Sequence, residues 1–546
     1  MTLVTHLSIS ALPASVLVAL VLTLAWVLRR RSRGPFPPGP PPKPIIGNAL
    51  DITADMPWLN YWEWSKKLGS DIIHLSAMGT HIVVLHSMED VNELMEKRSA
   101  NYSSRPWIAI AGLLGIDNLT ALIPYDKEWR KHRLIFQEGL GKGTMSLYYR
   151  AFTENVHVFI DLLLREPERF KDHCQWLSAA VTMSMTFGYD VATGGREDHY
   201  VSMAEQILAA ATKLCHPSGT LINAIPFLRH VPPWFPGAQT QRWAAEVKKL
   251  SMAHKNEPFD EVKEKMLAGT AKECVSTRLL QRRLKDNDTK LEDEDELKDT
   301  LANVYLAGTE TVGRSNILKK RESLICEIDR TAQIQASQLV FIMAMALYPS
   351  VQERAQAEID RVVGTDRLPM YEDRPLLPYM EAVLRETLRW RLVAPLAIPH
   401  VTAKDDVYKG FFFPKGTLVV PNGWAISRDE KIYADPELFN PARFLNSDGT
   451  LNDDRLDFAY GYGRRICPGR FMANDVLWMV MAAVISSFNI SKARDANGAE
   501  VEIDSNAFSS GLTSFPRPFK CSIVPRSRQA EMLVRLSAAN AKESMK

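Results

Sequence analysis

A single cysteine stands in a loop whose residues suit the binding of a metal. Cys467 lies in residues 459–469, which read Ala-Tyr-Gly-Tyr-Gly-Arg-Arg-Ile-Cys-Pro-Gly. Three glycines in this loop permit backbone conformations that bring a chain close to a flat cofactor: Gly461, Gly463 and Gly469. Arg464 and Arg465 can favour the thiolate form of Cys467, which is the form that ligates metals. The loop predicts a thiolate–metal site, with a structural cysteine as the alternative, and the apolar residues after it predict a helix.

A carboxylate and a guanidinium lie three residues apart in Pro378–Trp390, where apolar residues recur at helical spacing. Glu386 and Arg389 would therefore share one face of a helix and could pair. Arg443 follows downstream in Asn-Pro-Ala-Arg-Phe, and its planar guanidinium suits bidentate pairing with a carboxylate. For such a pair alone, a solvated surface contact is the alternative.

Two other segments carry candidate functional residues before this helix. Trp129 and Arg133 are four residues apart and would lie on one helical face, although Trp129 alone could be a core aromatic. Further on, the chain reads Leu-Ala-Gly-Thr-Glu-Thr-Val, in which Gly308 leaves room for a close approach. Glu310 and Thr311 of this segment can relay protons as general acids.

These segments, in this order, resemble the cytochrome P-450 family, in which a cysteine thiolate is the axial ligand of haem iron. The resemblance implies haem ligation by Cys467. It places four residues at the haem propionates: Trp129, Arg133, His400 and Arg465. It places three at the dioxygen-activating helix: Gly308, Glu310 and Thr311. It implies a buried structural triad: Glu386, Arg389 and Arg443. The chain departs from the family at Tyr460, where Phe is usual, and at Ala442, where Glu is common.

The resemblance implies a haem-thiolate monooxygenase that inserts one oxygen atom from dioxygen into a small hydrophobic substrate. Residues 231–238, 394–400 and 404–410 resemble fungal members, namely O-methylsterigmatocystin oxidoreductases and basidiomycete tryptamine 4-monooxygenases, which favours secondary metabolism or xenobiotic oxidation. The implied partner is NADPH–cytochrome P-450 reductase. Two alternatives remain open: a reductase-independent peroxygenase or isomerase, and a catalytically impaired haem-binding protein.

By family analogy, four segments should line the substrate pocket: residues 108–114, Ala307, residues 393–398 and residues 510–513. Their side chains are mostly small or aliphatic and include no evident unpaired carboxylate or guanidinium. A largely apolar pocket recognises mostly apolar molecules, so we expect an aromatic or terpenoid substrate. An indole-type amine lacks an acidic partner in these segments, and a strongly anionic substrate is disfavoured.

Length and composition agree with one large, mainly α-helical domain that carries small β-sheets. A net charge of +2 is too small to imply a nucleic-acid partner, and six scattered cysteines indicate a reducing compartment. No Gly-x-Gly-x-x-Gly follows a predicted strand, so electrons should come from another protein. Four cationic residues could form a basic face toward an acidic reductase: Lys131, His132, Arg464 and Arg470. Strands are predicted in residues 71–85, as a hairpin, and in residues 410–413 and Leu418–Pro421.

The N-terminus predicts a membrane anchor. Residues 7–28 carry no charge and are long enough to span a bilayer, whereas the apolar region of a cleaved signal peptide, the alternative, is normally shorter. Arginines follow this run at Arg29, Arg30, Arg31 and Arg33, which predicts a cytoplasmic catalytic domain. We therefore expect a single-pass endoplasmic-reticulum protein with an anchor in residues 1–28, a stiff proline-rich hinge in residues 29–50, a catalytic domain in residues 51–525 and a frayed polar tail in residues 526–546.

One internal segment departs from the family pattern. Residues 313–334 introduce charged side chains where the family has an uninterrupted apolar helix, and unpaired buried charge is costly. Deleting the segment would restore the family's spacing. Our hypothesis is a translated retained intron, because Val and Gln codons at its borders suit splice sites. The rival is a surface excursion that leaves the helix and returns to it.

Overall fold

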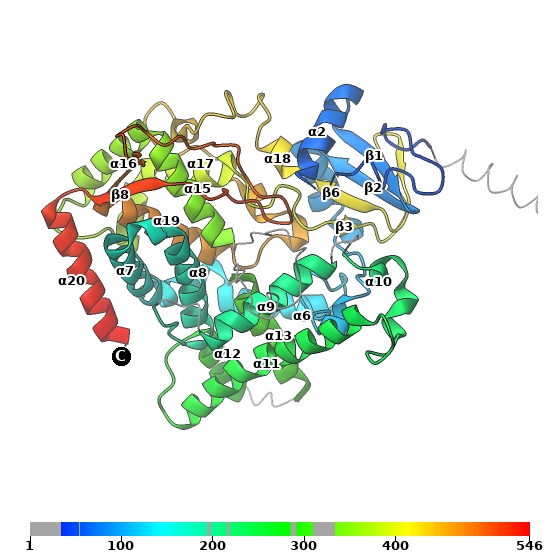
Figure 1. Ribbon diagram of the computed structural model, residues 1–546, viewed down its shortest axis with the longest axis horizontal. Coiled ribbons are helices and arrows are strands. Elements are labelled where there is room, and N and C mark those ends of the chain that lie inside the picture. Colours follow the sequence, from blue (N-terminus) through cyan, green and yellow to red (C-terminus); the bar gives the residue numbers. More distant parts are fainter. Residues whose placement is uncertain are drawn as a thin grey trace, which may run out of the picture.

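The protein consists of a larger helical part and a smaller part built around a sheet, as Figure 1 shows for the computed structural model. The structure describes residues 34–53, 55–193, 198–215, 219–285, 291–308 and 333–545. Several predicted features lie outside these residues: the anchor in residues 1–28, Glu310, Thr311 and most of the insert at 313–334. The mainly α-helical fold with small β-sheets is as predicted.

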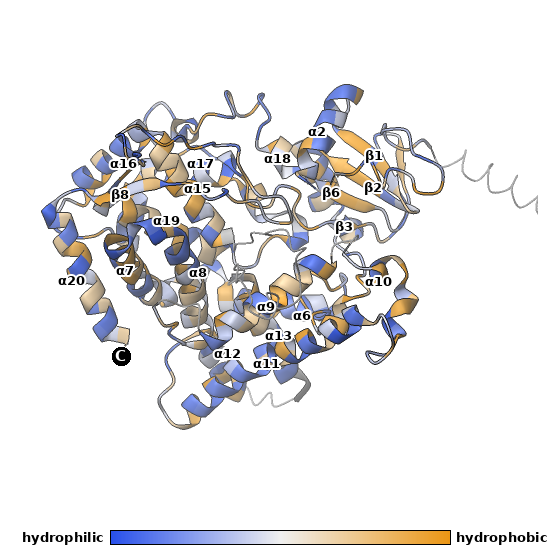
Figure 2. Ribbon diagram, in the orientation of Figure 1, coloured by the Kyte–Doolittle hydropathy of each residue, from blue (hydrophilic) through white to orange (hydrophobic). Residues whose placement is uncertain are grey.

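The largest sheet has the strand order β1-β2-β6-β3. Its strands are β1 (Ile72–Ala77), β2 (Thr80–Leu85), β6 (Leu418–Pro421) and β3 (His400–Val401). β1 and β2 form the predicted antiparallel hairpin, which turns at Met78 and Gly79, both with positive φ. β6 runs parallel to β2 and antiparallel to β3. Figure 2 shows that β1 and β2 are rich in hydrophobic residues, which pack against their neighbours.

Two smaller sheets have two strands each. Their strands are β4 (Asp406–Tyr408) with β5 (Phe411–Phe413), and β7 (Phe488–Lys492) with β8 (Cys521–Pro525). The strands predicted in residues 410–413 and at Leu418–Pro421 are therefore confirmed.

The proline-rich segment at the start of the described chain is packed against the main sheet. Phe36 stacks on the rings of His74 and His81, with centroids 4.6 and 4.8 Å away. The carbonyl of Pro38 accepts a bond of 2.9 Å from the amide of His74. A Cβ on Gly39 would lie 1.8 Å from the carbonyl oxygen of His74, so only glycine fits there. The described part of the predicted hinge, residues 34–50, is thus held in place against the sheet.

The helical part is centred on four buried or half-buried helices: α7 (Tyr149–Arg165), α8 (Phe170–Phe187), α15 (Gln333–Leu347) and α19 (Arg470–Ser487). Residues 334–346 of α15 are buried throughout, and all of them except Gln335 and Gln338 are small or apolar. The helices packed around this centre are α6 (Lys127–Leu140), α9 (His199–Cys215), α11 (Gln239–Leu267), α12 (Val275–Lys285), α13 (Leu291–Gly308), α16 (Pro349–Val362), α17 (Pro378–Trp390) and α20 (Arg528–Met545).

Shorter elements complete the described chain. The α-helices are α2 (Pro57–Leu68), α3 (Met88–Val91), α4 (Ser99–Tyr102), α5 (Ala111–Leu114), α10 (Leu221–Ala224) and α18 (Gly423–Ile426). One π-helical turn is η1 (Asn92–Lys97). The 3₁₀ turns are η2 (Lys142–Tyr148), η3 (Pro167–Arg169), η4 (Pro226–His230), η5 (Tyr371–Leu376), η6 (Pro441–Phe444), η7 (Asp457–Tyr460) and η8 (Gly463–Arg465).

The prediction of a frayed polar tail is wrong. Residues 528–545 form helix α20, which lies along α7 (Figure 1). Its small apolar residues recur three or four positions apart and are buried: Ala530, Val534, Ala538 and Ala541. Lys542 also pairs with the buried Asp161 of α7 at 2.8 Å. The overall polarity of the tail hid this narrow apolar stripe, which is enough to dock a helix.

Within the described residues, no single helix is both long and apolar enough to cross a membrane. One strongly bent pair of helices, Ile334–Leu347 with Pro349–Val362, meets the length and composition requirements together.

Candidate active site

The loop around Cys467 is held against η1 by contacts that require glycine. Gly463 has a φ of 58°, and a Cβ there would lie 2.1 Å from the carbonyl oxygen of Met95. The amide of Gly463 donates to a carboxylate oxygen of Glu96 at 2.7 Å. The amide of Cys467 donates to the carbonyl of Tyr460 at 2.8 Å, which closes the loop on itself. Cys467 is thereby presented just before the first turn of α19, which begins at Arg470.

Opposing effects act on the Cys467 thiol. Burial raises its pKa, whereas the amide of Gly469 and the charges of Arg133 and Arg470 act in the opposite direction. Both arginines are held close to the cysteine by backbone bonds. Arg133 donates to the carbonyl of Ile466 at 2.7 Å, and Arg470 donates to the carbonyl of Cys467 at 3.0 Å. These two guanidinium groups are therefore the cations that favour a thiolate at this position.

The prediction that Arg464 and Arg465 would stabilise the thiolate is wrong, because both side chains are engaged elsewhere. Arg464 donates to the hydroxyl of Tyr125 and also lies over its ring. The guanidinium of Arg465 donates to three backbone carbonyls at 2.7 to 3.0 Å: those of Ser103, Thr120 and Ile123. The cation that precedes a cysteine in sequence need not face its sulfur.

A buried arginine that the sequence did not suggest lies beside Arg465. Arg105 is 9% exposed and donates to the carbonyls of Ile398 and Pro399 at 2.6 and 2.8 Å. Burial and the charge of Arg465 lower the pKa of Arg105, and burial lowers that of Arg465 to about 10. No spacing pattern links Arg105 to the cysteine loop, so only the fold reveals their proximity.

The other residues predicted to contact propionates gather around these arginines. Trp129 is buried, and the Arg465 guanidinium lies 4.8 Å from its ring centroid. His400 is 3% exposed, and its Nδ1 lies 2.6 Å from the carbonyl oxygen of Tyr102. Burial lowers the pKa of His400 well below its usual value, so this ring is neutral. The structure thus brings together Trp129, Arg133, His400 and Arg465.

These side chains suit a cofactor that carries negative charge. In the described part of the chain, no Asp or Glu lies within ion-pair distance of Arg105, Arg133 or Arg465. Buried guanidinium groups satisfied only by carbonyl dipoles are costly unless an anion is bound near them. Haem carries two propionates, and a thiolate at Cys467 is the donor that its iron takes in such proteins. The residues present therefore fit haem.

The predicted triad is connected by hydrogen bonds, and two of its three members are fully buried. Glu386 accepts from Nε and Nη2 of Arg389 at 2.7 and 2.8 Å and from Nε of Arg443 at 3.2 Å. It also accepts from the amide of Asn440 at 2.8 Å. Glu386 and Arg389 are both 0% exposed. The triad ties α17 to the segment that leads into the cysteine loop.

Helix α13 carries the start of the predicted dioxygen-activating segment. A Cβ on Gly308 would lie 2.4 Å from Oγ1 of Thr182 on α8, so glycine is required for the packing of these two helices. This packing role was not predicted. Ala307, a predicted pocket residue, is exposed. Glu310 and Thr311 follow directly and lie outside the described residues.

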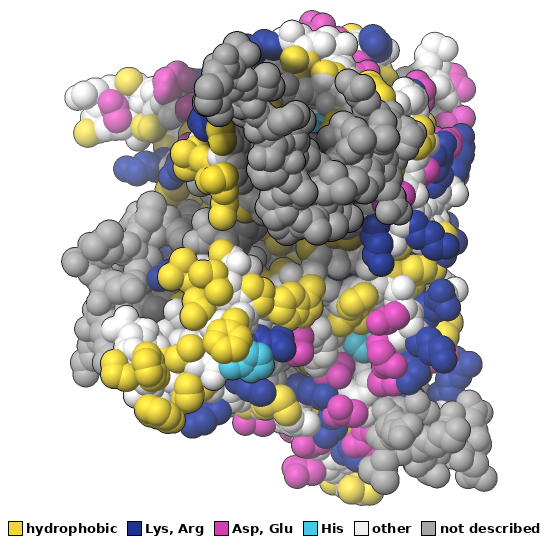
Figure 3. Space-filling view, turned by 90° about the vertical axis from the view of Figure 1, so that its right-hand side faces the viewer, with side chains coloured by type: hydrophobic (Ala, Val, Ile, Leu, Met, Phe, Trp, Pro, Cys, Tyr) yellow, Lys and Arg dark blue, Asp and Glu magenta, His cyan; other side chains and the backbone are white. Residues whose placement is uncertain are grey.

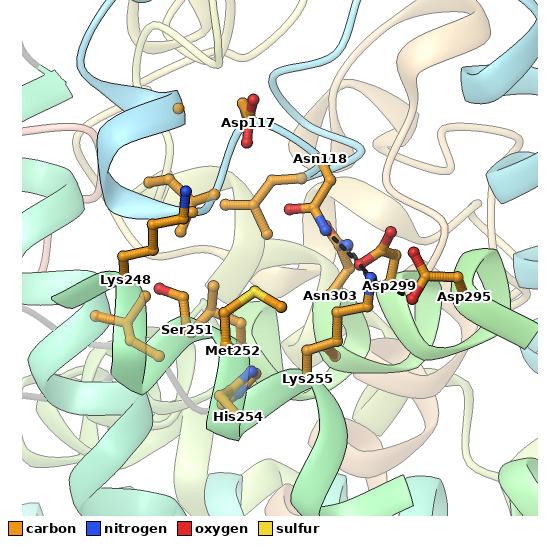
Figure 4. Close-up of a pocket in the computed structure, with 17 residues that line it drawn as sticks. Asp117, Asn118, Lys248, Ser251, Met252, His254, Lys255, Asp295, Asp299 and Asn303 are labelled. Carbon is orange, nitrogen blue, oxygen red and sulfur yellow. Dashed lines mark hydrogen bonds and ion pairs between the residues drawn. The ribbon is translucent and has the colours of Figure 1, made fainter. Parts of the chain in front are cut away.

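A cavity of about 360 Å³ lies between α11, α13 and residues 112–119 (Figure 4). Of the residues predicted to line the substrate pocket, only Gly112 lines this cavity. No residue of 393–398 or 510–513 does. Val393 packs instead in a small apolar cluster with Ala336 and Phe515. Carboxylates line the cavity, including Asp117 and Asp299, which the predicted apolar segments did not contain.

The predicted basic face is only partly present. His132 is buried, its Nδ1 lies 2.8 Å from Oγ1 of Thr120, and burial lowers its pKa. It is therefore neutral and does not belong to a charged surface, contrary to the prediction. Lys131 forms an ion pair with Glu296 of α13. Arg464, which is part of the cysteine loop, is exposed as predicted.

Comparisons with known proteins give a consistent picture. A family model described as cytochrome P-450 matches residues 37–315 and 336–514. The chain is 36% identical over 524 residues to the cytochrome P-450 monooxygenase claR of Ampulloclitocybe clavipes, covering 95% of this chain and 91% of that protein. It is 37% identical over 512 residues to cytochrome P-450 monooxygenase 98 of Postia placenta, covering 93% of each. It is 36% identical over 531 residues to the monooxygenase ple1 of Rhodocybe pseudopiperita, covering 96% of each.

Proposed function

This chain belongs to the cytochrome P-450 family, which binds haem through a cysteine thiolate. We therefore propose that Cys467 is the ligand of its haem iron and that the protein oxygenates a small hydrophobic molecule. Its relatives are oxygen-incorporating oxidoreductases. The observation that carries the proposal is the group of buried arginines around the Cys467 loop, which lacks carboxylate partners in the described residues. Haem supplies the redox chemistry when it is bound.

The residues of the chain divide the remaining tasks. Arg105, Arg133 and Arg465 hold the propionates, with Trp129 and His400 packed beside them. Glu386 with its two arginines fixes the segment that supports the cysteine loop. Glu310 and Thr311 are assigned the delivery of protons to dioxygen, because a carboxylic acid and a hydroxyl at this spacing can act in sequence.

The supply of electrons is assigned to NADPH–cytochrome P-450 reductase, since the chain has no nucleotide-binding motif of its own. Arg464 and Arg130 are exposed beside the cysteine loop, and both lie over the ring of Tyr125. Complementary charge accelerates encounter with an acidic partner and is weakened by salt. Arg464→Glu should slow reduction by the reductase at low ionic strength, and an unchanged rate would reject this docking surface.

Attachment to the endoplasmic-reticulum membrane is supported by the uncharged run in residues 7–28 and by an exposed apolar surface. Figure 3 shows hydrophobic side chains gathered on one face, and large exposed ones lie in α10, in η4 and in the residues next to them: Leu221, Ile225, Phe227, Trp234 and Phe235. In Figure 1, α10 and the sheet that receives residues 34–53 lie on the same side of the molecule. Apolar surface of this kind suits contact with lipid.

The insert bears on whether the chain is active. The family match stops at residue 315 and resumes at residue 336, which supports an insertion close to the predicted residues 313–334. If the segment is present in the mature protein, a catalytically impaired haem-binding protein is the second candidate function. Sequencing the mature transcript tests the intron hypothesis, which is rejected if the dominant message contains the segment.

The function is tested by expressing forms with and without residues 313–334 together with a reductase. Each form is supplied with terpenoids, polycyclic aromatics and indoles, and products are sought that contain one oxygen atom from labelled dioxygen. We expect the form without the insert to give a product that contains labelled oxygen, and we expect its substrate to belong to the precursors of fungal secondary metabolites. Turnover that needs only peroxide, or oxidation confined to hydrophilic anions, would overturn the proposal.

A further inference from the structure

The cavity between α11 and α13 has polar groups that the proposed chemistry does not use. Its volume, about 360 Å³, lies within the range of ordinary ligand pockets, roughly 300 to 1,000 Å³. Figure 4 shows polar side chains placed around it, with His254 on the side opposite Asp117. Apolar side chains complete the lining, among them Leu119, Ile207 and Leu306. The cavity therefore offers an apolar wall with a few polar contacts.

The α13 wall of this cavity carries more negative than positive charge. Asp295 and Asp299 share the single ammonium of Lys255, at 2.9 and 2.7 Å. Asp299 is held further by Asn118, and its side chain is only 12% exposed. One lysine cannot neutralise two carboxylates, so a negative charge remains on this wall.

Charges at the rim of the cavity do not cancel this excess. Asp117 is exposed at the rim and forms no ion pair with any described residue. Lys248 also lines the cavity and is exposed, so its single positive charge can offset that of Asp117 but leaves the excess on the α13 wall. A second, open cavity shares Asp117 and Asp299 and adds the carboxylates of Glu128 and Glu296, which share the one ammonium of Lys131. The mouth and the α13 wall together favour a cation.

His254 gives independent evidence for a ligand. Its side chain is 3% exposed and lines the cavity, and its Nε2 has no hydrogen-bond partner among the described residues. The ring stacks on Tyr305 with centroids 4.9 Å apart and planes 10° apart, so only its edge can reach the cavity. Burial lowers the pKa of His254 to about 4, which leaves a neutral ring able to donate or accept. A buried polar group without a partner is costly, by roughly 1–3 kcal/mol, unless a ligand satisfies it.

We propose that this cavity binds an organic amine, with its ammonium at the Asp117–Asp299 side, its apolar body along Leu119 and Leu306, and a hydrogen-bonding group on Nε2 of His254. The inference rests on the proposed function, because it takes the amine to be the substrate or a molecule on its way to the haem. Helix α13 links the cavity to the proposed haem site, since Leu306 lines the cavity and Gly308, two residues later, belongs to the predicted dioxygen-activating segment. The sequence had offered no acidic partner for an amine, and Asp117 and Asp299 supply one.

Calorimetric titration of the haem-loaded full chain at pH 7 tests this with three probes that share an indole ring. Tryptamine carries an ammonium group, tryptophol is its neutral counterpart, and indole-3-propionate is an anion. We expect tryptamine to bind at least about tenfold more tightly than tryptophol, because charged hydrogen bonds are stronger than neutral ones. Indole-3-propionate should bind most weakly of the three.

Two variants and one control assign the binding to this cavity. Asp117→Asn should weaken tryptamine by about two- to fivefold, as expected for an exposed charge pair, and leave tryptophol unchanged. His254→Phe, which keeps a ring to stack on Tyr305, should weaken both indoles by about fivefold. Asp453→Asn removes an exposed carboxylate outside the cavity and should change neither affinity. Because Asp117 is exposed, its variant keeps the proposal testable even if His254→Phe does not fold.

Equal affinities for the three probes would overturn the proposal, as would a preference for tryptamine that both cavity variants leave intact. A tryptamine-induced change in the haem spectrum that Asp117→Asn does not affect would indicate ligation of iron by the amine and would also overturn it. The proposed function is assessed separately, by the thiolate-type spectrum and by oxygenation of neutral substrates. Loss of amine preference with both of those intact refutes only the cavity assignment.

Discussion

Replacing Glu386 with glutamine should reduce the free energy of unfolding by about 3–5 kcal/mol, the usual cost of removing one partner of a buried ion pair. The structure explains why the loss should be large. Glu386 is 0% exposed and accepts four hydrogen bonds, three of them from Arg389 and Arg443. Glutamine has nearly the same shape, but its neutral amide leaves two buried guanidinium groups without a carboxylate, and its NH₂ group faces donors.

Urea titration followed by circular dichroism measures this change, with Glu353→Gln as the matched control. Glu353 is exposed on α16 and forms no ion pair with a described residue, so its substitution should cost less than about 0.5 kcal/mol. Haem content should fall in parallel for Glu386→Gln, because the triad supports the cysteine loop. A loss of stability below about 1 kcal/mol would refute the view that this triad holds the fold around the cofactor.

Three further predictions follow from the structure. Arg105→Gln should accelerate haem transfer to apomyoglobin by about tenfold, as expected for losing a buried charged hydrogen bond, whereas Arg242→Gln on the surface of α11 should not. Deleting residues 528–546 should lower the thermal midpoint by several degrees, because it uncovers the face of α7 that α20 buries; an unchanged midpoint would show that α20 adds no stability. Burial lowers the pKa of His86 to about 4 from an ordinary value of about 6.5, so below pH 6.5 the unfolded chain binds more protons than the folded one. Stability should therefore fall between pH 6.5 and 4, and His86→Asn should reduce this fall in urea titrations at each pH.

Much of the fold could be predicted where the pattern is local. The hairpin at β1 and β2, the helix at α17 and the helix after the cysteine follow from apolar spacing and turn residues. Helix α20 was missed because its apolar stripe consists of alanines and one valine in an otherwise polar segment. Helix α16 begins at Pro349, because proline suits the first turn of a helix.

The site was predictable to the extent that its residues form short motifs. Trp129 with Arg133, and Glu386 with Arg389, are helical neighbours whose pairing follows from spacing alone. Arg105 was missed because its role depends on two distant carbonyls, of Ile398 and Pro399, which no local pattern connects. For the same reason Arg470 and Arg133, and not the adjacent Arg464 and Arg465, act on the thiol of Cys467.

No sequence motif predicts the cavity between α11 and α13. Its carboxylates come from α13 and from the loop before α6, and each alone is an ordinary charged residue. Only the packing of α11 against α13 places beside them the Nε2 of His254, which has no hydrogen-bond partner among the described residues. Polar residues that are scattered along the sequence do not indicate that they will line one cavity.

The central proposal is that Cys467 is the thiolate ligand of haem iron, and the absorption spectrum of the reduced, carbon-monoxide-bound protein tests it most directly. The unaltered chain, loaded with haem, should show the Soret position typical of thiolate ligation. Cys467→His should lose it, because a neutral imidazole donates less charge to iron than a thiolate does. A Cys467→His protein that binds haem and keeps the thiolate-type Soret position would contradict the assignment of Cys467.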